Sequence, residues 1–253
     1  MKTSFAAFLF SISILIVAGC HRGGGTISEG RFSYNATDVF GDGTSQLALA
    51  EAAGRGDVES INRLIAAGAN VNYAGKHEIT PLWWAAWARN VNGFEALLVR
   101  GANPNTQRAE GLPVMCLIAD MDDSRYLKAA LAHGGNPNLQ DAKSGETPLF
   151  PAVKHSRNEQ IDLLLAAKAD VNVQLPIMGW TATMFAMAAR ADYHVIYQLL
   201  QAGSDPTLKA SDGRTLADII DVRSINASNN NDPWRVKVLE FLRNKRIAVN
   251  QSP

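Results

Sequence analysis

One five-residue pattern returns along the chain at nearly constant spacing, and it constrains the fold more than any other feature. It reads Gly-Ala-Asn-x-Asn at residues 68–72 and 101–105, and it returns with small changes at 134–138, 168–172 and 203–206. The copies begin 33, 33, 34 and 35 residues apart. A period of this length is typical of a chain built from stacked supersecondary units, none of which can bury its apolar face alone.

A second pattern keeps a constant place within each period. Thr80-Pro81-Leu82 and Thr147-Pro148-Leu149 open short apolar runs, and residues 112–114 and 181–183 hold the equivalent positions. Threonine before proline predicts a helix start, because the hydroxyl caps free amides and proline suits the first helical position. A turn and a second amphipathic stretch follow, as at residues 58–65. We therefore expect pairs of helices joined by projecting loops.

The two patterns agree in register from about Gln46 to Ala210, and together they resemble the ankyrin repeat. The resemblance implies an all-α ankyrin-repeat solenoid of about six helix-turn-helix units with projecting loops, over residues 45–245. The first unit lacks its opening loop, and the last is an atypical capping unit that is interrupted by a polar insert and resumes at Trp234. Pro151 lies far inside its first helix, so that helix is expected to start late or to be kinked.

The first residues of the chain have the pattern of an export signal. Lys2 precedes an apolar run that is too short to span a bilayer, and the run ends at Val17-Ala18-Gly19-Cys20. These four residues resemble the lipobox of bacterial lipoproteins. We expect a signal peptide at 1–19 and a lipidated Cys20, although an ordinary signal peptide with a chance cysteine or a retained helix would also fit.

The resemblance to lipoproteins also predicts where the protein lies in the cell. Residues 20–44 would be the lipid anchor and a flexible tether, and residues 246–253 a C-terminal tail. Within the tether, residues 32–40 are apolar enough to pack on the first repeat. Because His21 and not Asp follows Cys20, we expect a periplasmic protein that is lipid-anchored in the outer membrane.

Charge and motifs give little sign of catalysis. The 24 basic and 24 acidic residues balance, so there is no electrostatic reason to expect nucleic acid as a partner. The five histidines lack metal-ligand spacing, and the usual catalytic motifs are missing. Asp120, Asp122 and Asp123 are interpreted as a solvated turn with a helix cap, and Cys116 as a buried, inert thiol. We expect no enzyme activity, no cofactor and no metal.

In ankyrin stacks, partners usually bind a concave face made of the loop tips and the exposed ends of the first helices. Trp83, Trp84 and Trp87 cannot all face one way, because helix positions one apart diverge. We expect Trp83 to pack inward and Trp87, with Trp84, to reach the concave face. The alternative is that these aromatic residues pack between repeats. The predicted partner-binding residues are Lys76, His77, Ile79, Trp84, Trp87, Gln107, Arg108, Lys143, Ile177, Met178, Trp180 and Arg190.

The leading functional hypothesis comes from a further resemblance. A lipobox, a glycine-rich tether and a tryptophan-rich second unit are similar to ankyrin-repeat lipoproteins of Gram-negative bacteria, some of which neutralise phospholipase effectors delivered by type VI secretion systems. The resemblance implies an immunity protein that is a monomer before it binds a secreted lipase on its concave face. Two alternatives remain: a structural adaptor for envelope proteins, and a helper of a periplasmic enzyme such as a catalase.

Overall fold

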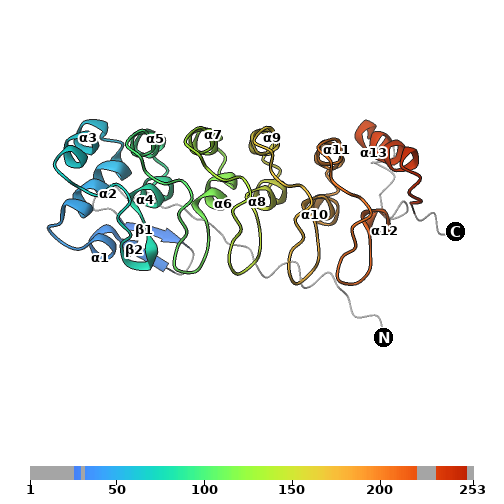
Figure 1. Cartoon of the computed structure of the whole chain (residues 1–253), viewed down its shortest axis with the longest axis horizontal. Helices are drawn as coiled ribbons and strands as arrows, with labels where there is room; N and C mark the ends of the chain where they lie inside the picture. Colours follow the sequence, from blue (N-terminus) through green and yellow to red (C-terminus); the bar gives the residue numbers. More distant parts are fainter. Residues whose placement is uncertain (1–25, 30–31, 221–231, 250–253) are drawn as a thin grey trace. The chain divides into compact units, whose positions relative to one another are not determined.

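The computed structural model describes residues 26–29, 32–220 and 232–249, and the chain divides into two compact units, residues 1–102 and 103–253. Helix pairs dominate both units, so the predicted all-α ankyrin solenoid is confirmed (Figure 1). The predicted signal peptide and Cys20 lie outside the described residues. Within the described residues, none of the helices has the length and apolar character needed to cross a membrane.

Unit 1 holds a short hairpin and two helix pairs. The hairpin is antiparallel, with Thr26 opposite Asn35. Its helix pairs form the first two repeats, and a short helix before them packs on the first pair. The elements are β1 (Thr26–Glu29), β2 (Phe32–Asn35), α1 (Ala36–Phe40), α2 (Ser45–Arg55), α3 (Val58–Ala66), the 3-10 turn η2 (Lys76–Glu78), α4 (Pro81–Trp87) and α5 (Val91–Val99).

Unit 2 holds the remaining four helix pairs, and in Figure 1 its first three pairs stand side by side, each preceded by a projecting loop. The second helices occupy one layer, and the first helices lie between that layer and the loops. The elements are α6 (Val114–Ala119), α7 (Arg125–Ala132), α8 (Leu149–Lys154), α9 (Asn158–Ala166), α10 (Ala182–Arg190), α11 (Tyr193–Gln201), α12 (Leu216–Ile219) and α13 (Pro233–Asn244).

The predicted threonine caps are present at two of three helix starts. The Thr80 and Thr181 hydroxyls accept hydrogen bonds from the amides three residues on, at 3.2 and 3.3 Å. The Thr147 hydroxyl is buried and has no partner among the described residues. Helix α8 instead begins at Leu149, one residue after Pro148. The late start places Pro151 in the first turn, where a missing N–H removes no helical hydrogen bond, so the expected late start is confirmed.

The Gly-Ala-Asn-x-Asn blocks close one repeat and bind it to the next. The first residue of each block follows a second helix and adopts a left-handed backbone conformation. The φ angle is +97° at Gly68 and +64° at Lys168, which stands in place of glycine in one copy. Their last asparagines then link neighbouring blocks. In unit 2, Asn172 Nδ2 donates to the Gly203 carbonyl at 3.1 Å, and its Oδ1 accepts from the Asp205 amide at 2.7 Å. This asparagine ladder accounts for the constant spacing of the pattern.

The core is built mainly from the first helices. Every residue of α4 and of α6 is buried, and the second helices add single buried faces, such as Leu127 and Ala130 of α7. At the end of unit 2, α13 packs against α11 and buries Val238 and Leu242, as expected for a capping helix. The predicted polar insert, residues 223–232, lies outside the described residues except for Asp232, whose carboxylate caps the start of α13.

Candidate protein-binding face

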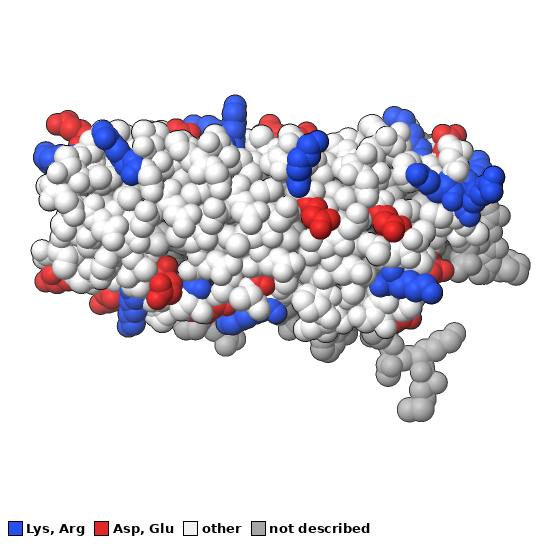
Figure 2. Space-filling view, viewed as in Figure 1, with Lys and Arg blue, Asp and Glu red and all other residues white. Residues whose placement is uncertain are grey.

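The inner face of each unit is the surface formed by the first helices and the loops that precede them. Figure 2 shows that charged side chains gather along two edges, over the second helices and over the loops, and that the surface between them carries few charges. Among the described residues, no group of three or more histidine, cysteine, aspartate or glutamate side chains could hold a metal ion.

In unit 1, the loop tip contains both exposed and covered residues. Lys76 is exposed in the turn η2, whereas His77 is half-buried beneath the ring of Tyr34, with the ring centroids 5.4 Å apart. Ile79, predicted to be a tip residue, is fully buried, so that expectation is wrong. Its position directly before the Thr80 cap turns its side chain into the repeat core, since an apolar residue there packs against the new helix.

The expectation that Trp84 and Trp87 reach an exposed face is also wrong. Trp84 is 1% exposed and Trp87 7% exposed. The ring of Phe40 meets Trp84 edge-on at 5.8 Å, and the ring of Tyr34 lies 5.3 Å from Trp87. Trp87 does point to the inner face, but the chain's own N-terminal residues cover it there. Trp83 is completely buried, as predicted.

In unit 2, the predicted residues of the loop before α6, Gln107 and Arg108, bind to groups of their own loop or of the next loop. Gln107 Nε2 donates to the carbonyl of Gln140 in the next loop at 3.0 Å. The Arg108 guanidinium pairs with Glu110 at 3.0 Å, and the pair closes the loop tip. Lys143, in the following loop, is exposed, and its backbone amide is bound by the Asp141 carboxylate. Lys143 is thus an exposed cation on a well-ordered tip.

The loop before α10 carries the most exposed large apolar side chain among the described residues. Ile177 is 85% exposed, whereas Met178 is half-buried and Trp180 is 8% exposed. Trp180 packs with Met184 and Ala210, so it joins neighbouring repeats and is not the exposed anchor that was predicted. Arg190, the last residue of α10, has a side chain outside the described part of the structure.

The Ile177 loop is held by a dense set of hydrogen bonds. The Ser211 hydroxyl donates to the Ile177 carbonyl, and the Ser211 amide to the Met178 carbonyl, both at 2.9 Å. The Leu175 amide donates to the Trp180 carbonyl across the base of the loop at 2.9 Å. An apolar side chain on a braced loop loses little entropy on binding, which favours an interface.

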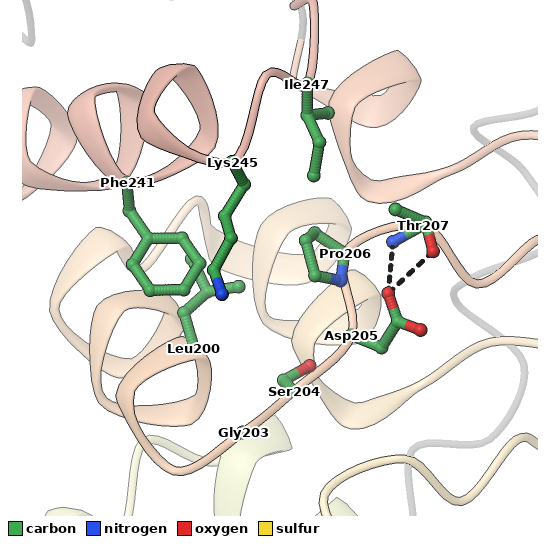
Figure 3. Close-up of a pocket in the computed structure, with 9 residues that line it drawn as sticks. All are labelled: Leu200, Gly203, Ser204, Asp205, Pro206, Thr207, Phe241, Lys245 and Ile247. Carbon is green, nitrogen blue, oxygen red and sulfur yellow. Dashed lines mark hydrogen bonds between the residues drawn. The ribbon is translucent and has the colours of Figure 1, made fainter.

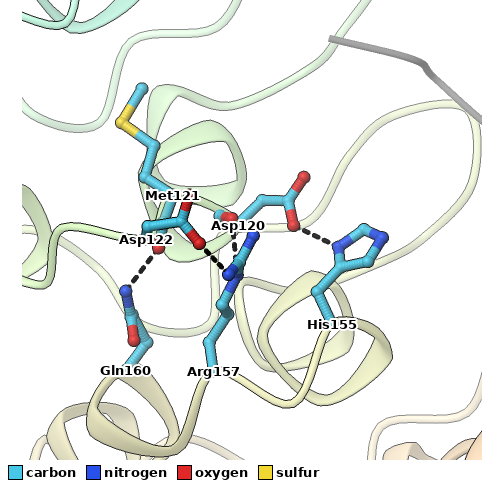
Figure 4. A network of polar contacts seen from close by, with 6 residues as sticks. All are labelled: Asp120, Met121, Asp122, His155, Arg157 and Gln160. Carbon is cyan, nitrogen blue, oxygen red and sulfur yellow. Dashed lines mark hydrogen bonds and ion pairs between the residues drawn. The ribbon is translucent and has the colours of Figure 1, made fainter.

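The carboxylate cluster of the third unit is a solvated turn only in part, since Asp122 is exposed but Asp120 is half-buried. Figure 4 shows Asp120 and Asp122, which follow α6, facing His155 and Arg157 from the turn between α8 and α9. Asp120 pairs with His155 and Asp122 with Arg157, whose Nε also donates to the Asp120 carbonyl at 2.9 Å. The buried Gln160 side chain donates to the Met121 carbonyl. The network joins two repeats, and a spacing of 35 residues between Asp120 and His155 was its one sequence signal.

Burial changes the acidity of two groups near this network. Burial raises the pKa of the Glu146 carboxyl, partly offset by the positive charge of Lys154. Burial also raises the pKa of the Cys116 thiol well above its ordinary value, with Glu146 and Asp141 adding to the effect. The predicted burial of Cys116 is confirmed, and a thiol with a raised pKa is expected to be a poor nucleophile.

A shallow groove of about 320 Å³ lies at the far end of unit 2, between α13 and the loop after α11 (Figure 3). Leu200, Phe241 and Ile247 form its apolar walls. Two of the polar groups that line it are engaged within the repeats: the Asp205 carboxylate accepts from Thr207, and the Ser204 hydroxyl shares a hydrogen bond with Thr183. The Lys245 ammonium lies over the Phe241 ring, 5.9 Å from its centroid.

Comparison with known proteins agrees with this geometry. A family model of three ankyrin-repeat copies matches residues 115–210, and a model of a single ankyrin repeat matches residues 77–109. Together they cover just over half of the chain. Ankyrin repeats bind other proteins, so the coarse role of this chain is protein binding.

Relatives share the repeats over only part of their length. Protein PhlB of Serratia liquefaciens is 38% identical over 132 residues, which are 52% of this chain and 58% of PhlB. Human Rabankyrin-5 is 29% identical over 71% of this chain and 15% of its own length. The rat ankyrin repeat and SAM domain-containing protein 6 is 36% identical over 30% of this chain and 8% of its own length. The helix pairs, the loop ladder and the family matches agree, and the chain belongs to the ankyrin-repeat family.

Proposed function

We propose that this protein is a non-enzymatic periplasmic lipoprotein that binds and inhibits a toxin acting in the periplasm, such as a type VI secretion phospholipase effector. The lipobox-like motif at Cys20 and the export signal before it support the location. The repeat fold supports binding. The immunity role rests on the resemblance to ankyrin-repeat lipoproteins described above.

The observation that carries the binding site is the braced, exposed Ile177. A solvated loop tip gains nothing from an isoleucine that is 85% exposed, and the hydrogen bonds from Ser211 fix its position before any partner arrives. An apolar side chain held on a braced loop loses little entropy when a partner covers it, which favours its use as an anchor. The exposed Lys143 on the preceding loop of unit 2 would form the polar part of the contact.

The partner is identified by capture from native envelope extract, with residues 21–253 as bait, followed by mass spectrometry. One dominant lipase or other hydrolase, bound one to one and inactive in the complex, supports immunity. Deleting the gene should then poison the cells unless the hydrolase gene is deleted too. A resident envelope protein without hydrolase activity would contradict immunity and support an adaptor, and loss of one resident enzyme activity without toxicity would support a helper.

The binding site is tested with two matched variants. Ile177→Asp places a charge on the exposed loop tip, and Val99→Asp places one at a 69% exposed position at the end of α5. Ile177→Asp should weaken the captured complex by roughly 30-fold or more, as expected for an interface anchor, while Val99→Asp leaves it unchanged. Equal effects of the two variants would show that the loop is not the contact.

The location is tested separately. Radiolabelled palmitate should enter the wild-type protein and not Cys20→Ser, and the labelled protein should co-sediment with the outer membrane. If the wild-type protein incorporates no palmitate, the lipoprotein proposal is contradicted, whereas the binding test is unaffected.

A further inference from the structure

The inner face of unit 1 is occupied by a segment that belongs to no repeat. We call residues 34–40 the docked segment, and the space it fills, between the loop residues 73–77 and helix α4, the unit 1 groove. The repeats begin at Ser45, where α2 starts. The docked segment comprises the end of β2 and all of α1, and α1 contacts α2 and η2. In ankyrin proteins, this side of the stack is where partners bind.

Aromatic contacts attach the segment to the helix side of the groove. The Tyr34 ring packs on Trp87 at 5.3 Å, and the Phe40 ring meets Trp84 edge-on at 5.8 Å. Phe40 is 2% exposed. The two aromatic residues, six positions apart in sequence, are thus seated in two sites, one on each tryptophan.

The loop side of the groove is shaped to admit the segment's backbone. Gly75 lies against Val39, and a Cβ at position 75 would stand 2.5 Å from the Val39 carbonyl oxygen. Next to it, His77 and Glu78 have φ of +61° and +57°. Non-glycine residues in this region are strained and cluster at functional sites. The loop surface at Gly75 is therefore complementary in shape to a peptide backbone. Beside it, the ring of Tyr34 packs against the ring of His77.

The segment is joined to the repeats by an exposed hinge. Gly41, Asp42 and Gly43 are all exposed, and both glycines have positive φ. The segment's start is paired with β1 through Tyr34 and Asn35. At its end, the Gly41 amide donates to the Thr37 carbonyl, and the Thr44 hydroxyl donates to the Phe40 carbonyl. Side-chain burial contributes to holding the segment in the groove and is opposed by the entropy of ordering seven residues.

We propose that the unit 1 groove is a peptide-binding site and that the docked segment is its displaceable internal ligand. The ligand class is a short segment with an aromatic residue followed, five and six positions later, by an aliphatic and an aromatic residue, as in Tyr34, Val39 and Phe40. A partner protein that carries such a segment would replace the internal one. The inference stands apart from the proposed toxin inhibition, since it concerns unit 1 and its test needs no partner protein.

The test uses a labelled peptide of residues 32–43 and the chain from residue 21 to 253. The wild-type groove is already filled, so the peptide should bind it weakly. In Tyr34→Ala/Val39→Asp, the internal segment can no longer dock, and the peptide should bind at least about tenfold more tightly, measured by fluorescence anisotropy. Adding Gly75→Ala to this variant should return binding to the wild-type level, because the new Cβ fills the backbone site and Gly75 has no positive φ. A peptide of scrambled sequence is the control.

Two results would overturn the proposal. If Tyr34→Ala/Val39→Asp loses the helical circular dichroism of the first repeats, the segment is an integral cap and not a displaceable ligand. If the variant stays folded and binds the peptide no better than wild type does, the groove is not a peptide site.

Discussion

The inner faces of the two units are built to the same repeat plan but present opposite surfaces. In unit 1, the surface is aromatic, and Tyr34 and Phe40 cover it. In unit 2, the loop before α10 carries an apolar tip, Ile177, that stays 85% exposed. The comparison indicates that the large aromatic side chains of unit 1 are covered by the chain itself, whereas Ile177 of unit 2 is left exposed.

The largest expected effect tests whether the aromatic residues of unit 1 are core. Trp84→Ala should lower the free energy of unfolding by about 3–5 kcal/mol, as for other buried aromatic residues replaced by alanine. Ile177→Ala should change it by less than about 0.5 kcal/mol, because the side chain is exposed. Urea unfolding followed by circular dichroism measures both. A loss below about 1 kcal/mol for Trp84→Ala would show that this side chain is exposed after all.

The next effect tests the rigidity of the Ile177 loop. At Gly179, φ is +64°, and an added Cβ would stand 2.7 Å from the Ser211 amide nitrogen. Gly179→Ala should therefore cost about 2–3 kcal/mol, combining strain with a clash. Gly213→Ala is the matched control, since φ is +84° there but nothing lies within 4 Å of the new Cβ.

Strain alone should make Gly213→Ala cost about 1 kcal/mol. Thermal unfolding of the two variants separates the clash from the strain. Equal losses for the two would mean that the Ile177 loop yields to the added methyl group and is less braced than its hydrogen bonds indicate.

A smaller effect, of opposite sign, concerns the tip of the unit 1 loop. Glu78 has φ of +57°, and the equivalent tips of unit 2 carry Gly111, Gly145, Gly179 and Gly213. Glu78→Gly should raise the free energy of unfolding by about 0.5–1 kcal/mol, because relief of the strain exceeds the added entropy of the unfolded chain. Lys76→Gly, two residues earlier and without positive φ, should give no gain. A loss of stability in Glu78→Gly would mean that the Glu78 side chain makes a contact that outweighs the strain.

The smallest expected effect is a change of stability with pH that depends on Glu146, in the loop before α8 of unit 2. Burial raises the pKa of Glu146 in the folded protein above its ordinary value of 4.5. The folded state then holds this proton more tightly than the unfolded state does, so stability is lost as pH rises through the folded pKa. Glu146→Gln should remove that loss. Urea unfolding of both proteins between pH 4 and 7 measures it, and parallel pH profiles would contradict it.

The sequence predicted the helix pairs well, since their signals are local. Thr80 before Pro81 starts a helix, and Gly68 ends one, through bonds and backbone angles within a few residues. The candidate face was predicted less well. Helical periodicity shows that Trp83 and Trp84 point differently, but it cannot show that Tyr34, more than 50 residues before Trp87, lies on Trp87.

The network between Asp120 and Arg157 was missed for a similar reason. Three aspartates after a helix are usually a solvated turn, and the residues that bind two of them come from the next repeat. Asp123 does behave as expected, since hydrogen bonds from Arg125 lower the pKa of its carboxyl. A local pattern predicts local partners, and it is silent on which side chains of the next repeat will face it.

The sequence by itself determined the repeat, its period and its class of function, because each repeat specifies its own turns, caps and apolar stripe. Only the tertiary structure decided which of the apolar loop and helix residues stay exposed. That outcome depends on what covers each position: the docked segment covers Trp87, neighbouring repeats cover Trp180, and Ile177 is left exposed at its loop tip. Exposure is a property of packing between distant segments, and packing follows from the sum of many weak contacts that no single stretch of sequence displays.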